Sequence, residues 1–370
     1  MKISQQLSLL IVFVLFFSGL QAQYEFKEEK RVQCSEIKNQ QRTGTCWSFA
    51  TSSFIESELK RKGLDVDVSE MFIVRKVYED KAFNYVMRQG KANFSQGSLS
   101  HDLMRTVARE GIVPEKNYMG RKSVQESFNH TEMEKGLKGF LDGVIAAKHP
   151  TNKWRKAVSA VLDVYLGKVP QDFKINGKKY NAIALRDMLQ LKDEEFVSLT
   201  SFTHHPFYSD FILEIPDNYS NGKFKNVPLD ELKSIVDHAL SKGYSIAWDG
   251  DVSEKGFSHK NGIAILPVDN KREDLFTVPG EEIKVTQSVR QEAFESWSTT
   301  DDHLMHLVGK SVDQDGTAYY LIKNSWGDEN QHEGYLYMSE SYFLMKTVAI
   351  MVNKNGLPDQ TKKLYSYTDE

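Results

Sequence analysis

The chain has few cysteines, because only Cys34 and Cys46 occur among its 370 residues. They could form one disulfide at most, so the fold must depend on packing rather than on a disulfide framework. Positive charge is not in surplus either, since the formal net charge is −4. Nucleic-acid-binding proteins usually carry a basic surface, so the charge gives no support to that class of partner.

Long apolar runs are also scarce. The longest covers residues 9–17, after a basic Lys2 and before small residues that end at Ala22. A membrane helix needs about 20 apolar residues, so this run predicts a secretory signal cut after about Ala22. We therefore expect an exported protein, periplasmic or secreted, whose mature chain has no membrane span. No internal repeat or low-complexity tract follows, and 40% hydrophobic with 26% charged residues is ordinary globular usage.

The most informative stretch is residues 39–50, NQQRTGTCWSFA. Apolar residues recur at helical spacing from Trp47 to Leu59, which predicts that a polar loop delivers Cys46 to the first turn of a helix. Backbone N–H groups at such a position are unpaired, and the helix dipole is positive. This field favours a thiolate, the nucleophilic form of cysteine. A buried, inert thiol is the alternative reading of a lone cysteine.

Three other positions favour the interpretation of Cys46 as a nucleophile over that of an inert thiol. The side-chain amide of Gln40, with the backbone N–H of Cys46, could stabilise the oxyanion formed when sulfur attacks a carbonyl. His303 could exchange a proton with the sulfur, and Asn324 could fix the tautomer of the imidazole. His306 is a rival imidazole, but on a strand it would face away from His303.

These residues resemble those of papain-like cysteine peptidases. The resemblance rests on Gln40, Cys46 with Trp47, Asp302 with His303, and the run Lys323-Asn324-Ser325-Trp326-Gly327. His303 and Asn324 lie roughly 260 and 280 residues after Cys46, whereas about 130–150 is usual in papains. Thr43 also replaces the disulfide cysteine of secreted papains. In both features the chain resembles the bleomycin hydrolase and aminopeptidase C branch of this superfamily.

The resemblance implies an α+β fold with a helical lobe, an antiparallel β-rich lobe and a helical insertion. The expected segments are a signal peptide 1–22, the N-terminal segment and helical lobe with the nucleophile 23–119, a mainly helical insertion 120–227, the β-rich lobe with His303 and Asn324 228–354, and a C-terminal tail 355–370.

The resemblance also implies further site residues. Gly97 and Ser98 align with the papain loop that pairs with the substrate backbone, although Ser98 replaces its second glycine. A plain surface turn is the alternative there. Trp326 is expected to shield the hydrogen bond between His303 and Asn324, and Trp47 supports the site beside Cys46. His204 and His205 invite a metal reading, but no carboxylate or cysteine neighbours them at ligand spacing in the sequence.

We therefore expect hydrolysis of peptide bonds through a thioester, with no metal or cofactor. In the resembled branch the C-terminal arm enters the cleft and restricts cleavage to amino-terminal residues, and the chains form hexamers. An aminopeptidase is accordingly expected. The alternatives are an endopeptidase with the same triad, an acyltransferase with the same cysteine and histidine, and an inactive papain-fold binding or assembly protein.

Overall fold

The computed structural model describes residues 23–366. The expected signal segment, 1–22, lies outside the described residues, as does the end of the tail, 367–370. The helices are α1 (Cys46–Arg61), α2 (Glu70–Met87), α3 (Ser100–Glu110), α4 (Thr131–Ala146), α5 (Lys153–Leu166), α6 (Ala182–Leu189), α7 (Leu229–Ser241), α8 (Gln287–Glu295), α9 (Glu340–Lys346) and α10 (Asp359–Ser366). None of these described helices is both long enough and apolar enough to cross a membrane.

Within residues 23–366, eleven strands form one large, mostly antiparallel sheet, and two more form a separate hairpin. The strands are β1 (Lys27–Arg31), β2 (Phe173–Ile175), β3 (Lys178–Tyr180), β4 (Phe196–Thr200), β5 (Asp210–Ile212), β6 (Lys223–Asn226), β7 (Ile246–Gly250), β8 (Phe257–Ser258), β9 (Ile263–Ala264), β10 (His303–Val312), β11 (Ala318–Lys323), β12 (Tyr335–Ser339) and β13 (Thr347–Asn353). The sheet order is β5-β6-β4-β13-β7-β10-β11-β12-β9-β8, and β1 also pairs with β10. The strand β10 therefore lies near the middle of the sheet.

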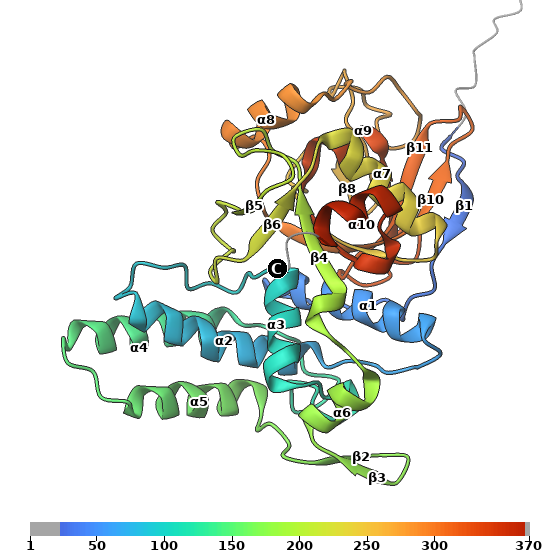
Figure 1. Ribbon diagram of the computed structural model, residues 1–370. Helices are drawn as coiled ribbons and strands as arrows, with labels where there is room; N and C mark the ends of the chain where they lie inside the picture. The colour runs from blue at the N-terminus through green and yellow to red at the C-terminus, as the bar shows by residue number, and fades with distance from the viewer. Residues whose placement is uncertain (1–22, 367–370) are drawn as a thin grey trace, which may run out of the picture.

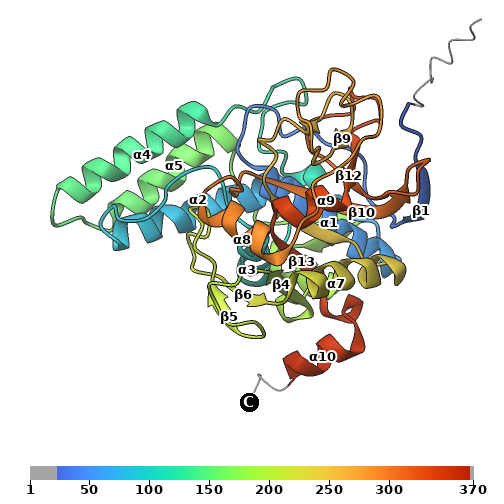
Figure 2. The ribbon, with the colours of Figure 1, turned by 90° about the horizontal axis from the view of Figure 1, so that it is seen from above.

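The two expected lobes are present, each with its own core. One core gathers apolar side chains of α1 to α6, and the other gathers those of the central strands with α7 and α9. Figure 1 shows the helices α2, α4 and α5 projecting to one side below the sheet, and Figure 2 shows the same arm from above. The α+β fold with a helical and a β-rich lobe is confirmed.

Helix α1 lies between the lobes. It packs against β10 and β7 on one side and against α2 and α3 on the other. Its polar face is consequently buried as well: Ser53 and Glu56 are as inaccessible as its apolar residues. Buried polar groups require partners, and here Ser53 bonds to His306 of β10. The nucleophile helix thus joins the two lobes, which its periodicity alone does not reveal.

The insertion is less helical than expected. Its first part forms α4, α5 and α6, but its last part contributes β4, β5 and β6 to the main sheet. The strand β4 lies between β6 and β13, and its residues Phe196, Val197 and Leu199 are buried. Within the segment 201–227, Asp217 lies against Gly97 of the helical lobe and accepts from Asn93.

Candidate active site

Cys46 is the first residue of α1, as the sequence predicts. The preceding loop is held by short hydrogen bonds: the hydroxyl of Thr43 donates to the carbonyl of Gln40 at 2.8 Å, and the backbone N–H of Gly44 donates to the side chain of Gln96 at 2.8 Å. The indole N–H of Trp47 donates to the carbonyl of Gln96 at 3.0 Å. Trp47 is 1% exposed, so it anchors the helix start rather than meeting substrate.

His303 and Asn324 lie side by side on the β-rich lobe. His303 begins β10, and its Nε2 lies 2.8 Å from Oδ1 of Asn324, just after β11. The ring of Trp326 lies over His303 with centroids 4.6 Å apart. This contact places Trp326 where the sequence expects a shield.

The thiol of Cys46 reaches the β-rich lobe beside His303. The backbone N–H of Leu304, the residue after His303, is directed at the sulfur, as is the backbone N–H of Trp47. Only 8% of Cys46 and 3% of His303 are exposed, so the site is nearly closed. The arrangement brings sulfur and imidazole to the junction of the two lobes.

The protonation states differ from the sequence expectation of a thiolate. Burial, reinforced by the charges of Asp301 and Asp217, raises the pKa of Cys46 to about 12. Burial also lowers the pKa of His303 to about 4, although its hydrogen bond to Asn324 acts in the opposite direction. The resting site is therefore a neutral thiol beside a neutral imidazole. The field at the start of α1 is too weak to offset the loss of hydration and the two nearby carboxylates.

Gln40 lies in the loop beside the site, and its side-chain amide is firmly oriented. Its Oε1 accepts from the hydroxyl of Ser325 at 2.7 Å, and its Nε2 donates to the carbonyl of Thr43 at 2.7 Å. An amide nitrogen carries two hydrogens, and Thr43 takes one of them. One N–H is left for an oxyanion. Ser325, which the sequence reading assigns no role, thus bridges the two lobes at Gln40.

The structure does not support the expected roles of Gly97 and Ser98. The carboxylate of Asp217, from the insertion, covers Gly97 so closely that a Cβ on Gly97 would lie 1.7 Å from Oδ2. The carbonyl of Gly97 accepts from the ammonium of Lys81. Ser98 is 1% exposed, and its hydroxyl donates to Asp102 at 2.8 Å. The insertion therefore occupies the surface on which substrate backbone was expected to pair.

His259 is a site residue that the sequence reading missed. Asn324 Nδ2 donates to Nδ1 of His259 at 3.1 Å, while Asn324 Oδ1 accepts from both His303 and the backbone N–H of Ser325. The ring of His259 also meets Trp326 edge-on, with centroids 5.2 Å apart. His259 thereby fixes the orientation of the Asn324 amide. It lies in the turn between the paired strands β8 and β9, and no motif marks it in the sequence.

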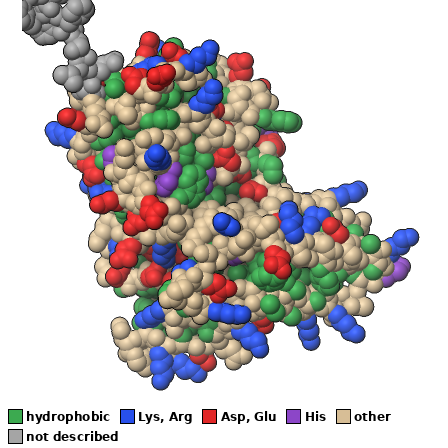
Figure 3. Space-filling view, turned by 180° about the vertical axis from the view of Figure 1, so that it is seen from behind, with side chains coloured by type: hydrophobic (Ala, Val, Ile, Leu, Met, Phe, Trp, Pro, Cys, Tyr) green, Lys and Arg blue, Asp and Glu red, His purple; other side chains and the backbone are tan. Residues whose placement is uncertain are grey.

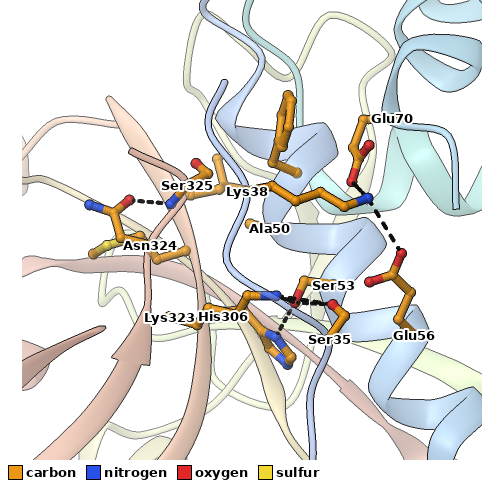
Figure 4. Close-up of a pocket in the computed structure, with 13 residues that line it drawn as sticks. Ser35, Lys38, Ala50, Ser53, Glu56, Glu70, His306, Lys323, Asn324 and Ser325 are labelled. Atoms are coloured by element: carbon orange, nitrogen blue, oxygen red, sulfur yellow. Dashed lines mark hydrogen bonds and ion pairs between the residues drawn. The ribbon is translucent and has the colours of Figure 1, made fainter. Parts of the chain in front are cut away.

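His306 points away from the nucleophile, as strand alternation predicts. It belongs to a buried polar cluster beneath the site, which Figure 4 shows between α1, α2 and the strands. In this cluster Lys323 donates to Ser53 at 2.8 Å, and Lys38 pairs with Glu70 at 2.7 Å. The enclosed volume is about 10 Å³, room for one water at most. The cluster consists of Ser35, Lys38, Ser53, Glu56, Glu70, His306 and Lys323.

The sequence has no carboxylate at ligand spacing from His204 and His205, but the folded chain brings one beside both rings. Glu214 accepts from both rings, at 3.2 Å and 2.7 Å. Gln291 Oε1 accepts from the backbone N–H of Thr203 at 2.6 Å, so its Nε2 donates to His204 Nδ1 at 3.0 Å. The proton of His204 must then lie on Nε2, which cannot also bind a metal. This tautomer fits a hydrogen-bonded group rather than a metal site.

Sequence comparison agrees with the papain-like fold. The Peptidase C1-like family matches residues 161–369, and the papain family of cysteine proteases matches residues 20–172. The chain therefore belongs to the Peptidase C1-like family, whose papain-like members are cysteine peptidases, and the resemblance drawn from its motifs is confirmed.

Among known proteins, the chain is similar to aminopeptidase C of Lactobacillus delbrueckii subsp. lactis, with 23% identity over 90% of this chain and 83% of the relative. It is also similar to human bleomycin hydrolase, with 21% identity over 92% of this chain and 84% of the relative. The crystal structure of PepW from Lactobacillus rhamnosis superposes with a TM-score of 0.71 at 17% identity, covering 92% of this chain and 85% of that one. These likenesses support the fold over nearly the whole chain.

Proposed function

We propose that the protein is an exported cysteine aminopeptidase that acts through Cys46, His303 and Asn324. The observation that carries this proposal is the hydrogen-bonded pair of His303 and Asn324 beside a cysteine at the start of a helix. Relatives named aminopeptidase C support the same activity.

In the proposed reaction the sulfur of Cys46 attacks the carbonyl carbon while its proton moves to His303. The backbone N–H of Cys46 and the remaining N–H of Gln40 stabilise the oxyanion. As the C–N bond breaks, His303 gives the proton to the leaving amine. Water then attacks the thioester with His303 as base, which releases the acid and restores the thiol.

Cleavage at amino-terminal residues is supported by the insertion. Asp217 covers Gly97, in the segment that resembles the papain loop that pairs with the substrate backbone. A longer chain on that side would have to displace the segment that carries Asp217. An exopeptidase fits this closed end better than an endopeptidase does.

The test compares a peptide reporter that has a free amino group with its acetylated form. We expect faster cleavage of the free form, and preference for the acetylated form would contradict the proposal. Cys46→Ala should abolish turnover, while Cys34→Ser, whose sulfur lies 3.3 Å from the hydroxyl of Tyr335, is the matched control and should retain it. Full activity of Cys46→Ala would contradict the assignment of Cys46 as the nucleophile.

Export through residues 1–22 and assembly into a homo-oligomer belong to the same proposal. Sequencing the amino terminus of the mature protein should find a start near Gln23, and an intact Met1 in exported material would contradict cleavage. Sedimentation of the purified protein would measure the oligomeric state, which the resemblance sets at six chains. Lys and Arg are interspersed with Asp and Glu on the face in Figure 3, with no continuous basic surface there.

A further inference from the structure

Three carboxyl groups from separate parts of the chain gather beside the nucleophile. Asp217 comes from the insertion, Asp249 from β7, and Asp301 immediately precedes the segment that leads into β10. Asp217 and Asp301 both act electrostatically on the thiol of Cys46. Asp249 is the register partner of Leu304, whose N–H faces the same sulfur.

Two of these carboxyl groups have oxygens that lack amide or hydroxyl donors. Asp249 is 4% exposed, yet no amide or hydroxyl group of the described residues donates to either of its oxygens or to Oδ2 of Asp301. The two carboxyl groups face each other and share a hydrogen bond. Burial and the charge of Asp301 raise the pKa of Asp249 well above its usual value, whereas burial and the charge of Asp217 raise the pKa of Asp301 to about 7. Unpaired buried carboxylates are costly, so the pair holds a proton at neutral pH that a cation could replace.

The cation already present does not fill this role. The ammonium of Lys81 is buried nearby, but its hydrogen bonds go to the carbonyls of Ser95 and Gly97. Asp217 receives its hydrogen bonds from neutral groups, Asn93 Nδ2 at 2.9 Å and Ser95 Oγ at 3.3 Å. The charge of Lys81 therefore offsets part of the negative charge of Asp217 and Asp301, but within the described structure its hydrogen bonds go to backbone carbonyls and not to the aspartates.

One member of the acidic group, Asp301, borders open space. A cavity of about 480 Å³ is lined by Asp301 and Thr300 on one side and by Ile215 and Pro216, next to Asp217, on the other. A metal site requires ligand atoms that lie close together. Among the described residues, the side chains of His204, His205 and Glu214 meet this requirement. The three aspartates are more widely spread, so a molecular cation fits them better than a metal ion does.

We infer that Asp217, Asp249 and Asp301 form the receptor for the α-ammonium group of the substrate's first residue. The inference rests on the proposed aminopeptidase activity and names the groups that restrict it to free amino termini. The amino group of a residue whose carbonyl is attacked by Cys46 lies only a few bonds from the sulfur, on the side that Asp217 closes. An ammonium group there would donate hydrogen bonds to the carboxylate oxygens of Asp249 and Asp301 that have no amide or hydroxyl donor.

Helix α10 is the last element of the chain that the structure describes. Helix α10 packs on α7, where the hydroxyl of Thr361 donates to Glu231 at 3.0 Å. Figure 2 shows α10 at the outer edge of the molecule, on the far side of α7 from the sheet. The aspartates therefore supply the negative charge from within the folded lobes, without a contribution from α10.

The test measures kcat and KM of Asp217→Asn and Asp301→Asn on leucyl-aminomethylcoumarin, its acetylated form, and acetyl-lysyl-leucyl-aminomethylcoumarin. Asp315→Asn, in an exposed turn, is the matched control. We expect KM for the free-amino reporter to rise at least tenfold in both site variants, with kcat changed less. Cleavage of the acetylated reporter should be unchanged or faster, which also shows that each variant is folded.

An unchanged ratio of free to acetylated cleavage in both variants would overturn the inference while leaving the aminopeptidase proposal intact. If the wild type instead cleaves acetyl-lysyl-leucyl-aminomethylcoumarin faster than the free-amino reporter, the aspartates bind a basic side chain of the substrate. That result would also overturn the inference. Deletion of residues 359–370 should leave the ratio unchanged. If that deletion alone abolished the preference, the tail and not the aspartates would be the receptor.

Discussion

Nε2 of His303 donates to Oδ1 of Asn324 across 2.8 Å, which leaves Nδ1 as the basic nitrogen of the imidazole. The same Oδ1 accepts from the backbone N–H of Ser325, and Nδ2 donates to His259, so the amide cannot rotate without losing a partner. Because the ring has a single tautomer, its base is always directed away from Asn324.

Replacing Asn324 with Ala should lower kcat by about 10²-fold, because the imidazole loses the acceptor that fixes its tautomer. Steady-state kinetics on the free-amino reporter measures the loss. His259→Phe keeps a ring against Trp326 but removes one partner of Asn324, so its effect should be smaller. A kcat for Asn324→Ala within twofold of the wild type would contradict the assigned role.

The alkylation rate of Cys46 should rise about tenfold per pH unit from pH 6 to pH 9, with no plateau. A thiol whose pKa is about 12 is overwhelmingly protonated over this range, and its thiolate fraction grows tenfold per unit. Mass spectrometry after iodoacetamide treatment of Cys34→Ser gives the rate. Asp301→Asn should speed the reaction, since the Asp301 charge raises the thiol pKa. A plateau below pH 7 would indicate a preformed thiolate.

Gly97→Ala should reduce kcat/KM for free-amino substrates by about 10²-fold, because misplacement by about 1 Å can cost that much. The added Cβ would meet Asp217 Oδ2 at 1.7 Å, so the insertion must move. Gly136→Ala, inside α4 with open space around it, is the control and should leave activity unchanged. Undiminished activity of Gly97→Ala would show that Asp217 does not restrict the cleft.

His130 should make the fold sensitive to acid. Burial lowers its pKa to about 4, and neither ring nitrogen has a hydrogen-bond partner in the described structure. Between pH 6.5 and 4 the unfolded chain gains a proton that the folded chain refuses, so stability falls as pH falls, by roughly 3 kcal/mol at pH 4. Thermal unfolding of His130→Phe should show a smaller loss from pH 7 to pH 5 than the wild type. Equal losses would contradict this assignment.

The sequence predicts the elements and the chemistry well where local pattern decides. Ser69 caps α2 by accepting from the N–H of Phe72 at 3.0 Å, and Cys46 begins α1, both as expected. Contacts between distant segments were not predictable in the same way. No local signal places Asp217 over Gly97, His259 against Asn324, or Glu214 between His204 and His205.

The protonation state of the nucleophile was missed for the same reason. A helix start favours a thiolate, but burial beneath the second lobe and the charges of Asp217 and Asp301 favour the thiol. Both effects depend on the tertiary structure, which brings Asp217 of the insertion and Asp301, just before β10, close to Cys46. The residue types of the site can be read from the sequence, whereas its electrostatics cannot.

The protonated state of Cys46 has a consequence for the proposed function of an exported peptidase. Oxidants attack thiolates far more readily than thiols, so a sulfur that holds its proton at rest resists conversion to sulfenic acid. An incoming ammonium would offset the negative field of Asp217 and Asp301 and make the thiol easier to ionise. The substrate itself would then switch on the nucleophile, and the idle enzyme would tolerate an oxidising environment without a protective disulfide.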